Sequence, residues 1–119
     1  MVSEFSIVSE LKDIREQKLR LSQEEARLSR PKLTDLTLIP TLFSWFCEYS
    51  GYHGLPEKQV RVKFYQKFIF IILFLYSPST LAGKKIAEGI RGVLAEVFGF
   101  KSPTGVSNLS VDVVFLYYY

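Results

Sequence analysis

Apolar residues recur at helical intervals over most of the chain, and residues 30–32 interrupt them. Before this break, residues 3–28 contain neither glycine nor proline, and their apolar positions alternate at spacings of four and three. Five apolar residues follow this spacing: Ile7, Leu11, Ile14, Leu21 and Leu28. Such spacing lines one face of a helix, as in a heptad repeat. The pattern predicts a charged helical arm over residues 1–30 with a candidate coiled-coil seam.

The form and the role of this arm remain open from its residues. The run Ser22-Gln23-Glu24-Glu25 matches a capping box, which would start a second helix at Ser22. The arm is therefore either one long helix or two short ones. Lys18 and Glu25 also occupy two seam positions, which weakens a coiled coil. The apolar stripe either packs on the chain's own core or joins an oligomer interface through Ile7, Leu11, Ile14 and Leu21.

Two helices are predicted next, after the break at Arg30-Pro31-Lys32, where proline cannot continue a helix. Residues 33–39 are extended or form a short helix. Pro40 suits a first helical position, and Gly51 a stop, with one inward face: Leu42, Phe43, Phe46 and Tyr49. A second helix runs from Pro56 to Ser77. Its segment 68–75 is apolar on every side, which predicts a central helix surrounded by protein.

Two more helices complete the prediction. One starts at Ser79 or Thr80 and runs to Val97, with Gly89 and Gly92 opposite its apolar face. The other covers residues 103–117. The fold class is therefore all-α: an N-terminal helical arm (1–30) and a compact helical domain of about four helices (31–119).

Composition and charge narrow the function classes. Hydrophobic residues make up 48% of the chain, enough for a core, and the net charge of +3 permits a nucleic-acid partner. The longest apolar run, residues 68–76, falls short of the roughly 20 residues that span a bilayer. The first residues lack the basic-then-apolar order of a signal peptide. We expect a cytoplasmic protein without a membrane partner.

The sequence contains few residues in arrangements typical of catalytic sites. The single cysteine, Cys47, and the single histidine, His53, exclude a zinc site of several cysteines, and no triad spacing surrounds them. Gly83-Lys84-Lys85 lacks the first glycine and the final serine or threonine of a phosphate loop. We therefore expect no enzyme, no metal, no cofactor and no small-molecule substrate.

The most specific stretch of the chain is residues 92–109. Ala95 is the small residue where two helices cross, and Gly99, four residues later, permits a left-handed turn. Phe100 would fill the core beneath the turn, and Ser102 would cap a helix that starts at Pro103. With these residues the stretch resembles the helix-turn-helix superfamily of DNA-binding proteins, and the resemblance implies a C-terminal helix-turn-helix.

The same resemblance implies an interface with double-stranded DNA. Exposed residues at the start of the second helix would enter the major groove: Lys101, Thr104, Ser107 and Asn108. Phosphate contacts would come from Lys84, Lys85, Arg91 and Lys101. The chain departs from the pattern in three ways. Its turn is one residue longer, so that Gly105 takes a β-branched position; the second helix has no arginine or lysine; and Asp112 would meet phosphates poorly.

The last helix has a second apolar side, which supports an alternative function. Projection at 100° per residue puts Val106, Leu109, Val113 and Leu116 on one face. The opposite side holds Val111, Phe115 and Tyr118. A helix apolar on two faces expects a further partner surface. The alternative is an assembly or adaptor protein that uses this helix for contacts with a protein partner or another copy, although the tyrosines 117–119 also suit packing on the chain's own core.

Overall fold

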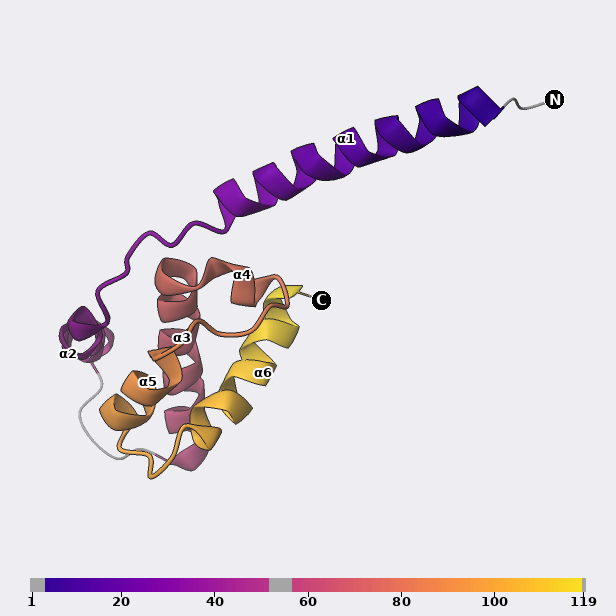
Figure 1. The fold of residues 1–119 in the computed structure, drawn as a ribbon. Coiled ribbons are helices and arrows are strands. Elements are labelled where there is room, and N and C mark those ends of the chain that lie inside the picture. The colour runs from indigo at the N-terminus through magenta and orange to yellow at the C-terminus, as the bar shows by residue number, and fades with distance from the viewer. Residues whose placement is uncertain (1–3, 52–56, 119) are drawn as a thin grey trace. The chain divides into compact units, whose positions relative to one another are not determined.

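A computed structural model describes residues 4–51 and 57–118 of the chain, with side chains through Leu116. The described part is helical without any strand, so the predicted all-α class is confirmed (Figure 1). The elements are α1 (Glu4–Leu28), the 3-10 helix η1 (Leu36–Leu38), α2 (Ile39–Ser50), α3 (Lys58–Tyr76), α4 (Pro78–Leu81), α5 (Ile90–Phe98) and α6 (Thr104–Tyr118). The chain divides into two compact units, Met1–Arg30 and Pro31–Tyr119.

The first unit is a single helix. α1 runs without a break from Glu4 to Leu28, so the capping-box residues at Ser22 lie inside a helix and start no new one. Arg27 pairs with Glu24 one turn earlier. None of the residues of α1 is buried.

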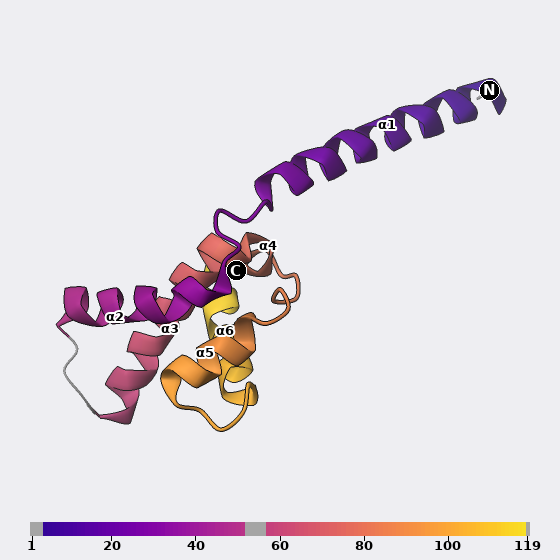
Figure 2. The ribbon, with the colours of Figure 1, turned by 60° about the vertical axis from the view of Figure 1, so that its left-hand side comes forward.

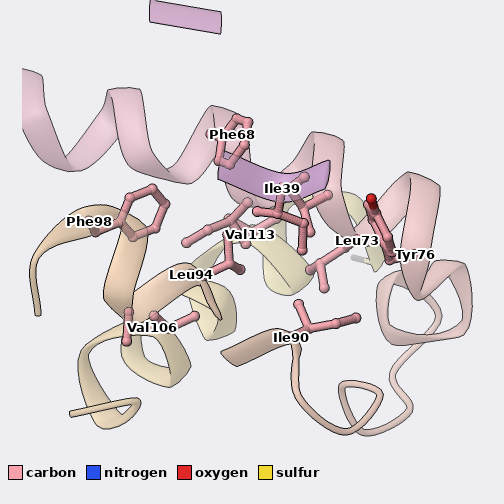
Figure 3. Packing of buried hydrophobic residues seen from close by; sticks show 12 residues of the cluster. Ile39, Phe68, Leu73, Tyr76, Ile90, Leu94, Phe98, Val106 and Val113 are labelled. Carbon is pink, nitrogen blue, oxygen red and sulfur yellow. The ribbon is translucent and has the colours of Figure 1, made fainter. Parts of the chain in front are cut away.

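The second unit is built around α3. Helices α2, α4 and α6 pack against α3, and α5 packs against α2 and α6 (Figures 1 and 2). Figure 3 shows side chains from α2, α3, α5 and α6 converging on one core. Its fully buried members are Ile39, Phe68, Ile69, Ile72, Leu73, Ile90, Leu94, Val106 and Val113.

Aromatic rings fill the end of this core between α2, α3 and α5. The Phe43 ring centroid lies 5.0 Å from that of Phe68 and 5.5 Å from that of Phe98, both edge-on. Tyr65 stacks on Phe98 at 4.2 Å. Edge-to-face and stacked pairs at these distances add to the burial of apolar area.

Residues 31–38 are held against the C-terminal end of α3. The backbone amides of Lys32 and Leu33 both donate to the Leu75 carbonyl, at 2.8 and 3.0 Å. The Tyr76 hydroxyl donates to the Asp35 carbonyl at 2.7 Å, and burial, followed by the charge of Asp35, raises the pKa of Tyr76. The segment then turns through η1 into α2, so the short-helix alternative applies only to its last residues.

The predicted helix over residues 79–97 is wrong, because the chain breaks it into α4, a loop and α5. Gly83 and Gly89 adopt φ of 96° and 89°. Positive φ values lie outside the right-handed helical region, and glycine adopts them readily. Thr80 Oγ1 donates to the Lys85 carbonyl, and the Ala87 amide donates to Ser77 Oγ. The described part of residues 31–119 thus contains five α-helices where the pattern predicts about four, and Gly89 precedes α5.

Three predicted burials are also wrong. Phe74 is 45% exposed, because it lies away from the side of α3 that packs into the core. Its ring instead lies under the Lys32 ammonium group, which is 4.1 Å from the ring centroid. Tyr49 is 93% exposed in the last turn of α2. Leu116 is 70% exposed although Val113, one turn earlier, is buried. Apolar spacing predicts the helices better than the extent of their cover.

The turn between α5 and α6 is closed at Gly99. This residue has φ 77°, and the next amide, of Phe100, donates to the Ala95 carbonyl at 2.8 Å. α6 begins at Thr104, one residue after the predicted Pro103, and the Ser107 amide donates to the Pro103 carbonyl. The ring of Phe100 packs edge-on against Phe98, as predicted for the residue beneath the turn.

Gly105 gives a test of this packing. A Cβ at Gly105 would lie 2.9 Å from Cδ2 of Phe100, whereas a Cβ at Gly92 would meet nothing within 4 Å. We expect Gly105→Ala to destabilise the domain by about 1–2 kcal/mol through overpacking. Gly92→Ala, the matched helical control, should stabilise it by roughly 0.5–1 kcal/mol. Urea denaturation measures both, and equal effects would contradict this account of Gly105.

Candidate nucleic-acid interface

The break between α4 and α5 brings Lys84 and Lys85 to the side of α6. A depression of about 330 Å³ is lined by both lysines together with Ser107 and the α6 residues Val111 and Phe115. A second depression, of about 400 Å³, is lined by Lys85, Ile86, Arg91 and Ser107. The structure therefore brings together four of the residues predicted for DNA contact, Lys84, Lys85, Arg91 and Ser107.

Arg91 is tied to the first turns of α6. Its Nη1 donates to Ser107 Oγ at 2.8 Å, and that hydroxyl donates to the Pro103 carbonyl at 3.3 Å. The contact holds the exposed guanidinium beside the N-terminal end of α6 and leaves further N–H donors for another acceptor. Ser107 is half-buried and uses its hydroxyl in these contacts, so it positions Arg91.

The remaining predicted DNA-contact residues lie at the same end of α6 without lining either depression. Lys101 lies exposed in the turn, and Thr104 and Asn108 are exposed on the first two turns. The three side chains are thus accessible to a ligand.

The charge around this end of α6 is positive. Residues 1–30 contain six basic and six acidic side chains, so residues 31–119 carry the whole net charge of +3. Among the described residues, no carboxylate lines either depression. Asp112, expected to oppose a phosphate partner, is reached by Gln66 Nε2 of α3 at 3.4 Å. Its carboxylate is therefore engaged toward α3.

The second half of α6 is apolar on its exposed side. Val111 is 66% and Phe115 63% exposed, in agreement with the predicted second face, whereas the side chain of Tyr118 lies outside the described residues. Beneath them Ser110 is buried, and its hydroxyl donates to the Val106 carbonyl at 2.7 Å. α6 thus presents polar residues over its first turns and apolar residues after them.

The predicted interface residues of the arm are all exposed in α1: Ile7, Leu11, Ile14 and Leu21. The other residues of α1 are not buried either, so α1 has no alternative buried face. The oligomer interface of the arm stays a prediction.

A groove between α3 and α6 is a feature that the sequence pattern does not predict. It measures about 510 Å³, and its lining residues are Phe46, Lys63, Gln66, Lys67, Phe70, Ile71, Val113 and Leu116. The available signals were the apolar residues all round α3 and the apolar face of α6 that holds Val113 and Leu116. Their cover by neighbouring helices depends on packing that spacing alone does not reveal.

No protein family, curated protein or solved structure matches this chain. The likeness to helix-turn-helix proteins consequently rests on the residues of positions 92–109 and remains a prediction.

Other chemistries have few candidate groups in the described ranges. Cys47 is half-buried, and burial raises the pKa of its thiol, which disfavours the nucleophilic thiolate. His53 lies outside the described residues. Within residues 4–51 and 57–118, no three His, Cys, Asp or Glu side chains are grouped to hold a metal ion. Over the same ranges, every helix is too short or too polar to cross a bilayer.

Proposed function

We propose that this chain is a non-enzymatic DNA-binding protein, a small regulator that presents the start of α6 to duplex DNA. The observation that carries the proposal is that Lys85 and Arg91 share a depression with Ser107 at this end of the helix, while Lys84 and Lys85 line a second depression that extends from Ser107 along α6. The loop after α4 supplies the two lysines, α5 supplies Arg91 and α6 supplies Ser107, which makes the cluster a property of the fold.

Phosphate chemistry suits this cluster. Lysine and arginine neutralise backbone phosphates and release bound counterions, and this term dominates non-specific affinity for DNA. Arg91 offers a planar set of donors, while Lys84 and Lys85 act as exposed point charges. The cluster would therefore fix the orientation of the domain on the duplex.

Base contacts would come from the exposed first turns of α6. In helix-turn-helix proteins the N-terminal residues of the second helix contact base edges. Asn108 has an amide that pairs with adenine N6 and N7, and Thr104 has a hydroxyl for a base or a phosphate. With few such residues, sequence discrimination should be modest compared with phosphate binding.

An assembly or adaptor function is the second candidate, and the exposed apolar half of α6 favours it. Val111 and Phe115 are solvent-exposed and line the depression that also holds Lys84 and Lys85. Contiguous apolar surface of this kind marks protein contacts more often than DNA contacts. Under this function the same face would bind a protein, and removal of the cations would have little effect.

Fluorescence anisotropy with labelled duplexes of random sequence tests the DNA proposal. We expect binding that weakens steeply as salt rises. Lys101→Ala should weaken binding to all duplexes and lower the salt slope by about 1, while Asn108→Ala should cost about 1–3 kcal/mol only on duplexes selected for tight binding. Lys12→Ala, in the arm, is the control. Absence of any binding at low salt would overturn the proposal.

A further inference from the structure

α1 contributes no residue to a hydrophobic core. All of its residues, Glu4–Leu28, are unburied, including the apolar seam. An isolated helix of mixed composition is only marginally stable in water, and most helices depend on an apolar face packed against a partner. We infer that α1 is a docking surface for α1 of a second copy, and that the two helices run antiparallel. This inference is independent of DNA binding.

The charges of the arm favour the antiparallel direction. Residues 4–16 hold four acidic and two basic side chains, and residues 17–30 hold four basic and two acidic ones. The N-terminal half is therefore net acidic and the C-terminal half net basic. An antiparallel pair sets each acidic half beside a basic half, whereas a parallel pair sets like halves together. Opposite charges at short range attract, and like charges repel.

The seam residues also favour antiparallel over parallel pairing. One set of seam positions is wholly apolar: Ile7, Ile14, Leu21 and Leu28. The alternate set is mixed: Glu4, Leu11, Lys18 and Glu25. In a parallel, in-register pair, Lys18 would face Lys18 of the partner copy and Glu25 would face Glu25 of the partner copy. Such contacts place like charges in the part of the interface that loses most water.

Antiparallel pairing removes these contacts. When Leu11 faces Leu21 of the partner copy, every mixed position lies opposite an apolar one. Lys18 then faces Ile14 of the partner copy, and Glu25 faces Ile7 of the partner copy. The methylene stems of lysine and glutamate can cover these apolar side chains while their charges remain in water.

The positions that flank the seam favour parallel pairing, but they contribute less free energy than the seam. Antiparallel pairing brings Arg15 near Arg15 of the partner copy, and parallel pairing would instead bring Glu10 near Arg15 of the partner copy. These residues flank the seam and stay in contact with water. Exposed pairs contribute only about 0–1 kcal/mol each. Charges opposed within the seam cost more, so the seam decides the direction.

Disulfide trapping tests both the pairing and its direction, in a Cys47→Ser background without DNA. In the antiparallel register, position 7 faces position 25, and the two copies of position 7 are about 27 Å apart along the axis. We expect the double variant Ile7→Cys, Glu25→Cys to oxidise to a covalent dimer, and either single variant to stay uncrosslinked. The matched control is Ser9→Cys, Gln23→Cys, which has the same axial register on the outer face and should not crosslink.

Light scattering on the Cys47→Ser protein, whose seam is unaltered, should give twice the 13.7 kDa chain mass. A crosslink from Ile7→Cys alone would show a parallel pair and overturn the proposed direction. A one-chain mass at the highest soluble concentration would overturn the pairing itself. Either result would leave the DNA-binding proposal standing, because that proposal rests on the other unit.

Discussion

Replacing Lys84, Lys85 and Arg91 together by alanine is expected to weaken duplex binding at least about tenfold at moderate salt. The three cations lie around Ser107 with no carboxylate lining the same depressions among the described residues. Each lost phosphate contact lowers the slope of log K against log salt by about 0.9, so the slope should fall by about 3. Anisotropy measured from low to moderate salt gives both quantities.

The control for this variant must remove the same charge elsewhere. Lys12, Arg20 and Arg30 are exposed, and they lie off the apolar seam of the arm. Their triple replacement by alanine changes the net charge equally and should leave the salt slope nearly unchanged. Equal losses from the two triple variants would mean that overall charge, and not the cluster beside α6, governs the affinity.

Phe68→Ala is expected to destabilise the domain by about 3–5 kcal/mol, the usual cost of emptying a buried phenylalanine site. The side chain is 1% exposed, and its ring lies among those of Phe43 at 5.0 Å and Phe46 at 5.4 Å. Both of these rings belong to α2, and a third neighbour, the ring of Phe98 at 6.2 Å, belongs to α5, so the cavity cannot close by a small shift of one helix. Urea denaturation followed by the fluorescence of Trp45 in α2 reports on this unit.

Phe74→Ala, in the same helix, is the matched control. Phe74 is 45% exposed, and its replacement removes less buried area and leaves no enclosed cavity. We expect it to cost less than about half as much as Phe68→Ala. If both variants lost the same stability, the side of α3 that forms the core would be misassigned.

Local chemistry in the sequence predicts much of this fold. Gly51 and Gly99 each end a helix with a left-handed residue, as their positions after apolar periodic segments indicate. Pro40 lies in the first turn of α2, where its missing N–H costs nothing. The continuity of α1 follows from the absence of glycine and proline, and the weaker capping signal at Ser22 is overridden.

The errors arise where long-range packing decides. Residues 79–97 have helical spacing, but the side chains of Ser77 and Thr80 hydrogen-bond to the backbone of the loop that breaks it. Tyr49 and Leu116 continue the apolar faces of their helices beyond the point where a neighbouring helix covers them. Spacing predicts a face, whereas cover requires the position of another element.

The candidate site likewise has features that the sequence indicates locally and features that only the packing of the chain determines. The residue types of Lys84, Lys85 and Arg91 indicate phosphate contacts, but the two lysines reach the side of α6 from a loop, where the spacing predicts a helix. Their convergence depends on the loop after Gly83. The engagement of Asp112 with Gln66 likewise depends on how α6 lies against α3. Neither feature has a local sequence signal.

Amide chemical-shift mapping during a titration with duplex DNA tests the central claim most directly. We predict that the amides that shift most belong to Lys84, Lys85, Arg91, Lys101, Thr104, Ser107 and Asn108. Amides of α1 and of the α3–α6 groove should move little. Shifts confined to Val111 and Phe115, or no shifts at low salt, would contradict the proposal that the start of α6 binds DNA.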